Sequence, residues 1–274
     1  MSDYTIELNV AKQAAKSAAG IIEKYQEESN FSVDFKGKND LVTEADLKAE
    51  QDILSILRQN FPDDHILAEE TSRKNELPEG RTWLVDPIDG TTNFAHGLPI
   101  YCISIGLWEE REPKMGLVME LGRREIFTAL KDRGAFLNGN PITVSKLEDP
   151  GNALIGTGFP YNDLSLVDQY LRFFRTLMEN TQGVRRPGAA SYDLCCVACG
   201  RFDGFYEYSL NPWDVGAAAL IVREAGGRVS DWNGGKNWLF GKRIVAGNPS
   251  VYEFLLDGIQ EHFSEQERAG RRES

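Results

Sequence analysis

Acidic residues directly follow short apolar runs at several separate points of the chain. The acids at these apparent strand ends are Glu69, Asp86, Asp89 and Asp214. Carboxylates at strand ends can converge from several segments, where unpaired charges repel and raise one another's pKa. A divalent cation removes that repulsion, and ligands that are all oxygen favour a hard ion such as Mg²⁺. An imidazole-based zinc site is poorly supported, because the chain has only 3 histidines.

The segment 86–94, with the sequence Asp-Pro-Ile-Asp-Gly-Thr-Thr-Asn-Phe, carries the most chemical information. Pro87 stiffens the turn between two acids, and Gly90 lets the backbone approach a ligand closely. If a helix begins near Thr91, its free N–H groups form an anion site beside the acids. Metal, phosphate and hydroxyl would then meet in one place, as metal-assisted attack of water on a phosphate ester requires. The alternative is a Pro-Gly turn in which an Asp and a Thr cap a helix.

Apolar periodicity predicts the elements that must position these groups. The first half is predicted to contain helices 3–28 and 44–59, short apolar strand segments at 65–68 and 83–85, and antiparallel strands at 102–108, 114–120 and 125–130. A hairpin turn is predicted at Asn138-Gly139. Beyond about residue 150, strands and helices alternate as in βα units. The predicted strands are 153–157, 183–186, 204–207 and 244–246, and the predicted helices are 164–180, 190–199, 215–226 and 251–262. We therefore expect two α/β subdomains, 1–148 with most of the acids and 149–274 supplying Asp214, and a frayed tail from residue 264.

Composition narrows the class of protein. Lys and Arg total 30 against 42 Asp and Glu, a formal net charge of −12, which argues against a general binder of nucleic acid or anionic membranes. No apolar run approaches the roughly 20 residues of a membrane span. Three of the 4 cysteines crowd into residues 195–199. The Cys196-x-x-Cys199 pair could be half of a metal or redox site, but core packing is the expectation in this apolar stretch. Without an export signal, a reducing cytoplasm is the simplest location.

The segment 86–94, with Gly97-Leu98-Pro99 just beyond it, resembles the first signature of the inositol monophosphatase family. Residues 213–218, Trp-Asp-Val-Gly-Ala-Ala, resemble its second signature, and segments 40–46, 68–71 and 156–161 match in order. The resemblance extends from about residue 5 to about residue 260. It implies a mixed α/β fold, a layered αβαβα sandwich of the inositol monophosphatase and fructose-1,6-bisphosphatase type.

The resemblance also implies a role for each matching position. The positions that would hold two to three Mg²⁺ ions are Glu69, Asp86, the carbonyl of Ile88, Asp89 and Asp214. The positions that would act on the attacking water are Thr91 with Asp46, the water-bridged helper Glu70, and the nearby charge of Lys36. The positions that would bind substrate are the Gly90 and Thr91 amides for phosphate, and Asp89, Ala190 and Glu207 for the sugar or polyol.

Several of these residues have ordinary structural alternatives. Thr43-x-x-Asp46 could be a capping-box variant that opens the second helix, and Asp46 could serve both purposes. Glu70 and Lys36 could be solvated surface charges, and Glu207 could be an exposed strand end. The chain also departs from the family pattern at two positions, 189 and 68, where alanine replaces the hydroxyl residue and the glycine common in relatives. A lost hydroxyl at 189 could loosen phosphate or sugar contacts.

By resemblance, the chain is expected to be a Mg²⁺-dependent, Li⁺-sensitive, homodimeric phosphatase that hydrolyses inositol 1-phosphate by attack of activated water. Thr92-Asn93-Phe94 resembles the inositol branch, since the nucleotide branch usually has Lys-Glu-Phe there. Alternatives are a broad sugar or polyol phosphatase, or specificity for fructose 1,6-bisphosphate, 3′-phosphoadenosine 5′-phosphate, NADP or histidinol phosphate. Another is an interaction protein, because some bacterial relatives bind the transcription machinery and catalysis could be dispensable. An exposed basic patch would support the interaction-protein alternative, and the candidates for such a patch are Arg123-Arg124 and Arg185-Arg186.

Overall fold

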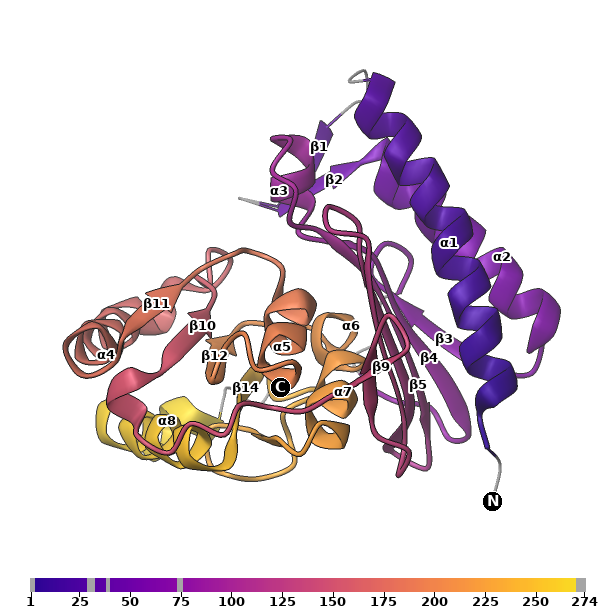
Figure 1. Ribbon diagram of the computed structural model, residues 1–274. Helices are drawn as coiled ribbons and strands as arrows, with labels where there is room; N and C mark the ends of the chain where they lie inside the picture. The colour runs from indigo at the N-terminus through magenta and orange to yellow at the C-terminus, as the bar shows by residue number, and fades with distance from the viewer. Residues whose placement is uncertain (1–2, 29–32, 38–39, 73–75, 270–274) are drawn as a thin grey trace.

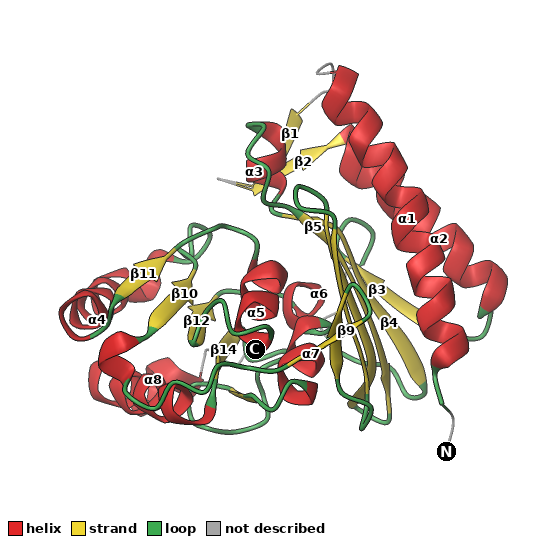
Figure 2. Cartoon of the chain, in the orientation of Figure 1, coloured by secondary structure: helices red, strands yellow, loops and turns green. Residues whose placement is uncertain are grey.

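The computed structural model describes residues 3–28, 33–37, 40–72 and 76–269, with backbone alone at 33–37 and 40–41. Its elements stack in five layers, helices and sheets alternating from one side of the molecule to the other (Figure 1). Figure 2 shows the two sheets in yellow, each covered by helices on both faces. The layered αβαβα fold predicted from the resemblance is therefore confirmed.

Two antiparallel helices form the first layer, α1 (Thr5–Glu28) and α2 (Glu44–Asn60). The buried face of α1 is mostly alanine, and such small side chains let helix axes approach closely. Ile22 of α1 and Ile53 of α2 complete the apolar core beneath them. Strands β1 (Val33–Gly37) and β2 (Asp40–Thr43) pair antiparallel between the two helices, an element that the sequence did not indicate.

The second layer is a seven-stranded sheet in the order β3-β4-β5-β6-β7-β8-β9. Its strands are β3 (His65–Ala68), β4 (Arg81–Asp89), β5 (Cys102–Glu109), β6 (Glu112–Glu120), β7 (Glu125–Leu130), β8 (Ala135–Leu137) and β9 (Asn140–Ile142). Only β3 and β4 pair in parallel, and the remaining pairs are antiparallel as predicted. The predicted hairpin is confirmed, with φ of 50° at Asn138 and 81° at Gly139, values typical of a type I′ turn.

The remaining layers come from the second half of the chain. The five-stranded sheet has the order β11-β10-β12-β14-β13. Its strands are β10 (Leu154–Thr157), β11 (Gly183–Arg185), β12 (Gly204–Tyr208), β13 (Arg228–Ser230) and β14 (Arg243–Gly247). The helices between the sheets are α5 (Ala190–Ala198), α6 (Pro212–Val215) and α7 (Ala218–Glu224), and those on the outer face are α4 (Val167–Asn180) and α8 (Pro249–His262). Strand β10 pairs in parallel with both β11 and β12, as expected of βα units.

Two predicted elements differ from the structure. The helix expected over 215–226 begins earlier, at Pro212, and is broken into α6 and α7. At the break, a Cβ on Gly216 would lie 2.7 Å from the Pro212 carbonyl, and Trp108 Nε1 donates to the Gly216 carbonyl at 3.1 Å. Within the tail expected to fray, Glu265–Ala269 instead form helix α9, whose Glu267 carbonyl accepts a hydrogen bond from Arg243 Nε at 2.8 Å, and residues 270–274 lie outside the described part of the chain.

The four cysteines are all free, and Cys102, Cys195 and Cys196 are buried, in line with core packing. Among the described residues, no helix has the length and apolar character needed to cross a membrane. Every strand of the seven-stranded sheet precedes residue 148 and every strand of the five-stranded sheet follows it. The central core nevertheless draws side chains from both sheets, so the division into subdomains 1–148 and 149–274 stays a prediction.

Candidate functional site

A cavity of about 230 Å³ opens where the ends of β4 and β12 meet the helices between the two sheets. The predicted site residues that line it are Glu69, Asp86, Ile88, Asp89, Gly90, Thr91, Ala190, Glu207 and Asp214. They come from strands, loops and helix ends that are up to 145 positions apart, from 69 to 214. The fold therefore brings together most of the acids that the sequence singled out.

Asp46 lies behind the cavity wall and contacts Thr91. The Thr91 hydroxyl is 3.1 Å from Asp46 Oδ1 and 2.9 Å from the Ile88 carbonyl, so its single proton has two possible acceptors. Asp46 is also the third residue of a capping box, since its Oδ2 accepts from the Thr43 amide at 2.8 Å. The capping role of Asp46 is therefore confirmed, and its role beside the attacking water stays a prediction that the Thr91 contact allows. Burial raises the pKa of Asp46 to about 6, against the hydrogen bonds from Thr43 and Thr91.

Gly90 joins β4 to the short helix α3 (Thr91–Ala95) in the left-handed conformation, with φ of 96°. A Cβ at this position would lie 2.9 Å from the Ile100 carbonyl and 3.3 Å from the side chain of Ala189. Glycine is therefore required both by the backbone conformation and by the close approach of the loop before α5.

Asp89 is held by the first residues of α5. The Ala190 amide donates to Asp89 Oδ1 at 3.2 Å, and the Ser191 amide donates to Oδ2 at 2.6 Å. The Ser191 hydroxyl donates to the same Oδ2. Sequence reasoning missed Ser191, although it supplies a hydroxyl two positions after the one that Ala189 lacks. Burial raises the pKa of Asp89, and the Ser191 hydrogen bonds oppose that rise.

Two further acids are crowded at the same place. Asp86 is buried, with Oδ1 accepting from the Ile88 amide at 3.0 Å, and Asp214 Oδ2 accepts from the Asn211 amide at 2.8 Å. Burial raises the pKa of both carboxyls well above the usual range, and the charges of Glu69 and Asp89 raise them further. Such mutual repulsion is relieved by a proton or by a cation.

The donor set fits a hard divalent cation, because it is anionic and consists entirely of oxygen. Within the part of the chain that the structure describes, no three His, Cys, Asp or Glu side chains are arranged closely enough to hold a metal ion as they stand. The residues that would hold one are Glu69, Asp86, Asp89 and Asp214, with the Ile88 carbonyl. The raised pKa values of the three aspartates are the electrostatic evidence that a positive charge is favourable here.

Glu207 lies on the opposite strand, β12, and is buried rather than exposed, which excludes the alternative of a solvated strand end. Its carboxylate occupies the space over Gly158, where any Cβ would collide with it. Burial raises the pKa of Glu207 to about 8, and the positive charge of Arg186 opposes this rise. Glu207 can therefore both donate and accept hydrogen bonds near neutral pH.

Besides Asp46, two predicted residues are not placed in the cavity. Glu70 is absent from the residues that line it, and the Glu70 amide donates to Glu50 Oε2 at 2.8 Å. Lys36 lies in β1, but its side chain is outside the described part of the structure. The roles assigned to these two residues, like those of the cavity residues, stay predictions.

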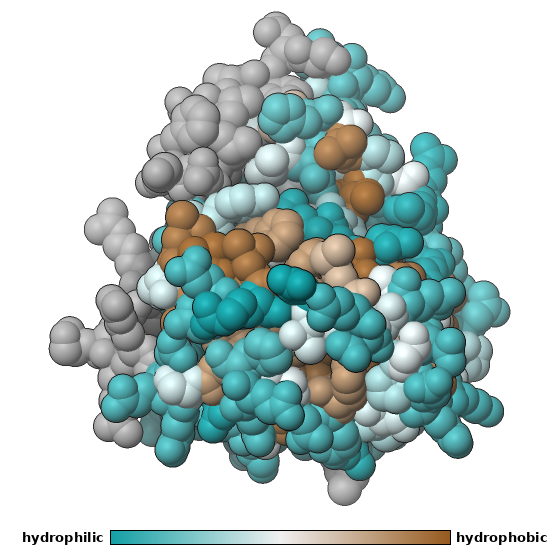
Figure 3. Space-filling view, turned by 90° about the vertical axis from the view of Figure 1, so that its left-hand side faces the viewer, coloured by the Kyte–Doolittle hydropathy of each residue, from teal (hydrophilic) through white to brown (hydrophobic). Residues whose placement is uncertain are grey.

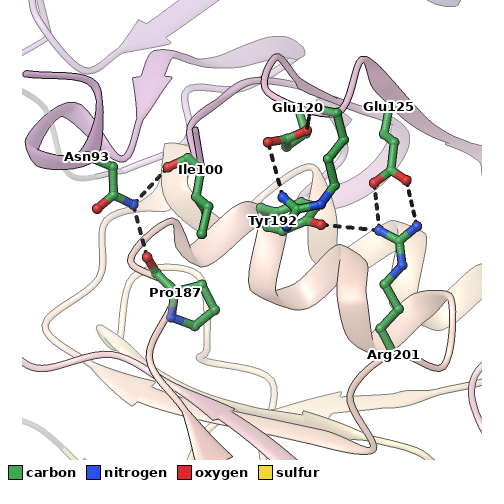
Figure 4. Close-up of polar contacts among 8 residues, drawn as sticks. Asn93, Ile100, Glu120, Glu125, Pro187, Tyr192 and Arg201 are labelled. Atoms are coloured by element: carbon green, nitrogen blue, oxygen red, sulfur yellow. Dashed lines mark hydrogen bonds and ion pairs between the residues drawn. The ribbon is translucent and has the colours of Figure 1, made fainter. Parts of the chain in front are cut away.

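Polar contacts that the sequence did not indicate tie α5 to the seven-stranded sheet (Figure 4). Asn93 of α3 donates through Nδ2 to the carbonyls of Ile100 and Pro187, at 2.8 and 2.9 Å. Beyond the other end of α5, Arg201 forms two hydrogen bonds with the Glu125 carboxylate, each 2.6 Å long. The helix that holds Asp89 is thus anchored near both of its ends.

Comparison with known proteins agrees with this geometry. The Nus factor SuhB of Pseudomonas aeruginosa is 44% identical over 260 residues, covering 93% of this chain and 96% of that protein. The structure of the extragenic suppressor protein suhB from Bartonella henselae superposes with a TM-score of 0.89 at 36% identity, covering 94% of this chain and 100% of that one. The inositol monophosphatase from Anabaena gives a TM-score of 0.81 at 33% identity, covering 95% and 97%.

The model of the inositol monophosphatase family matches residues 3–266. The match spans the cavity, both signature segments and all five layers, and it confirms the resemblance noted in the sequence. The chain belongs to the inositol monophosphatase family.

Proposed function

We propose that this protein is a divalent-cation-dependent phosphomonoesterase that hydrolyses its substrate by direct attack of water. The observation that carries this proposal is the convergence of four acids and Thr91 in one cavity, with Asp46 behind its wall in contact with Thr91. Mg²⁺ bound there would supply Lewis-acid chemistry, making water nucleophilic at neutral pH and stabilising charge on the leaving group.

The chain's own residues would orient and deprotonate the water. Thr91 Oγ1 contacts Asp46 Oδ1, so a water that donates a proton to Thr91 can pass it on to Asp46. With a pKa of about 6, Asp46 is mostly ionised at neutral pH and yet basic enough to accept that proton. The Gly90 and Thr91 amides would bind the phosphate, and Asp89, Ala190 and Glu207 would contact the organic part of the substrate.

Inositol 1-phosphate is the substrate that we propose within this class, with two to three Mg²⁺ ions per site and inhibition by Li⁺. The test is phosphate release from inositol 1-phosphate, fructose 1,6-bisphosphate, 3′-phosphoadenosine 5′-phosphate, histidinol phosphate and NADP, with Mg²⁺ and with or without Li⁺. The highest kcat/KM on inositol 1-phosphate, suppressed by Li⁺, supports the proposal. A clear preference for another substrate would keep the reaction type and replace the substrate, and no turnover at all would contradict both.

A second role, as a transcription-associated interaction protein, is favoured by the names of the relatives. Proteins named Nus factor SuhB, from Pseudomonas aeruginosa and Escherichia coli, are 44% and 38% identical to this chain. These names support the transcription-associated alternative better than inositol 1-phosphate hydrolysis as the main cellular role. The net charge of −12 favours protein partners over RNA.

The two candidate basic patches differ in how free their arginines are to contact a partner protein. Arg123 pairs with Glu120 and lies over the Tyr192 ring at 5.6 Å, so it takes part in the contacts around α5. Arg185 is exposed and bonds only its neighbouring carbonyl among the contacts described. Affinity capture from lysate, followed by mass spectrometry, should recover RNA polymerase subunits with both the wild type and Asp89→Asn. Loss of that capture in Arg185→Glu would locate the surface, and no polymerase with any variant would contradict this role.

The homodimer and the cytoplasmic location stay predictions. Three apolar residues along α4 and the turn before it, Leu164, Leu171 and Met178, are each at least half exposed. They are spaced seven residues apart. Figure 3 views the molecule from the side that bears α4 and shows apolar surface among hydrophilic residues. An apolar stripe of this kind suits contact with another protein surface. Analytical ultracentrifugation would measure the oligomeric state directly.

A further inference from the structure

Asp193 is a buried acid that the proposed reaction does not use. It lies in the first turns of α5 and is 1% exposed. Its Oδ1 atom has no hydrogen-bond partner among the residues that the structure describes. A buried oxygen without a partner costs folding free energy, and in native proteins such a group calls for a specific explanation.

The position of Asp193 supplies that explanation. Asp193 lines the same cavity as Glu207 and Arg186, on the side formed by α5 and β12. Burial raises the pKa of Asp193, the charge of Glu207 raises it further, and Arg186 lowers it, so the three groups are within electrostatic reach. The Arg186 guanidinium lies 5.3 Å from the centre of the Tyr161 ring, at the exposed margin of the cavity.

Two carboxyls that line one cavity and interact electrostatically suit hydroxyl ligands in either protonation state. An ionised carboxylate only accepts hydrogen bonds, and a hydroxyl can donate to it. A protonated carboxyl can also donate, and a hydroxyl can accept from it. A phosphate dianion only accepts, so it cannot bond an ionised carboxylate and is repelled by its charge. Arg186 is the single cation among these three groups and is already attracted to both acids.

We propose that Asp193 is a specificity-determining residue, which with Glu207 forms an acid pair that binds hydroxyl groups on the organic part of the substrate. The pair selects phosphomonoesters of neutral polyols and disfavours substrates that would place a second phosphate there. This inference rests on the proposed phosphatase function and adds the residue that sets its preference.

The test compares Asp193→Asn with the wild type on three substrates in Mg²⁺. Inositol 1-phosphate carries hydroxyls, p-nitrophenyl phosphate carries none, and fructose 1,6-bisphosphate carries a second phosphate. The variant should lose at least about tenfold in kcat/KM on inositol 1-phosphate, chiefly through KM, and less than about twofold on p-nitrophenyl phosphate. The ratio of fructose 1,6-bisphosphate to inositol 1-phosphate turnover should rise by at least about tenfold, equivalent to about 1.4 kcal/mol.

Asp257→Asn is the matched control, because it removes the same charge from an exposed position on α8 outside the cavity. Asp257→Asn should leave kcat/KM on each of the three substrates unchanged from the wild type. If Asp193→Asn fails to fold by circular dichroism, Asp193→Ser takes its place. Equal losses on all three substrates would show a merely structural role, and no change would show that Asp193 does not contact substrate. Either result overturns the proposal.

Failure of the phosphatase function itself gives a different result. In that case the wild type releases no phosphate from any of the three compounds. Calorimetric titration with Mg²⁺ and inositol 1-phosphate or p-nitrophenyl phosphate then tests the acid pair by binding alone. Weaker binding of inositol 1-phosphate only, in Asp193→Asn, supports the pair, and unchanged or uniformly weakened binding contradicts it.

Discussion

Asp46, behind the cavity wall, and Asp214, which lines the cavity, are built in the same way. Each is the third residue of a helix, and each accepts a 2.8 Å hydrogen bond at Oδ2 from the backbone amide of the residue that caps that helix, Thr43 or Asn211. In each case, an amide only three positions earlier in the chain therefore orients the carboxylate. The remaining oxygen of each, Oδ1, is left for the site.

Their surroundings differ. Burial raises the pKa of Asp46 only to about 6, because hydrogen bonds from Thr43 and Thr91 oppose that rise, and the charge of Glu69 adds a smaller increase. Burial raises the pKa of Asp214 well above the usual range, and the charges of both Glu69 and Asp89 raise it further. The same local motif thus yields a group suited to accepting a proton in one place and a group suited to sharing a cation in the other. Neighbours, rather than the motif, decide the chemistry.

Replacing Asp214 should have the largest effect and should abolish cation binding. We expect Asp214→Asn to lower kcat by about 10³-fold or more, because the carboxylates act as a unit. Calorimetry should show Mg²⁺ affinity falling with it. Thermal unfolding without metal should be unchanged or occur at a higher temperature, since one repelling charge is gone. If Asp214→Asn kept its Mg²⁺ affinity, the claim that Asp214 holds the cation and Asp46 does not would be contradicted.

Replacing Asp46 should separate proton transfer from cation binding. We expect Asp46→Asn to lower kcat by roughly 10²-fold, the usual contribution of a positioned general base. Mg²⁺ affinity measured by calorimetry should stay within a few-fold of the wild type, because Asp46 does not line the cavity in which the other acids gather. Parallel loss of affinity and rate would place Asp46 among the cation-holding groups instead.

The raised pKa of Asp46 should also appear in the pH dependence of stability. The folded state binds this proton more tightly than the unfolded state, so the stabilisation is fully present below about pH 4 and is lost as pH rises through about 6. As pH rises from 4 to 7, the free energy of unfolding of metal-free Asp46→Asn should therefore increase relative to that of the wild type by up to about 3 kcal/mol. Urea unfolding of both proteins across this range measures the difference, and a constant difference would contradict the shift.

The smallest expected effect comes from the capping hydroxyl. Thr43→Val keeps the shape of the side chain but removes the hydroxyl that donates to Asp46, and should cost about 1 kcal/mol of unfolding free energy. Activity should fall only modestly, because the Thr43 amide still orients Asp46. Thr43→Ser, which keeps the hydroxyl, is the control and should resemble the wild type in urea unfolding.

The features predicted correctly from sequence depend on local signals. The Asn138-Gly139 hairpin, the long helices and the acids after β3 and β4 each follow from residues within a few positions. Ser191, Asn93 and Asp193 were missed because their contacts join segments far apart in the chain. Asn93, for example, bonds a carbonyl 94 positions away, and nothing beside it in the sequence indicates that partner. The predicted helix is similarly divided at Gly216, whose carbonyl accepts a hydrogen bond from Trp108, 108 positions earlier in the chain.

The hydrogen bonds of Asp89 have a consequence for folding. The amides that hold its carboxylate belong to residues 101 and 102 positions further along the chain, whereas those of Asp46 and Asp214 lie three positions away. Contacts that close long loops form late, because their entropic cost must be met before they are made. Asp46 and Asp214 can adopt their native orientation as soon as a single helical turn forms. Asp89 reaches its own orientation only when both halves of the chain have come together, so the cavity becomes complete late in folding.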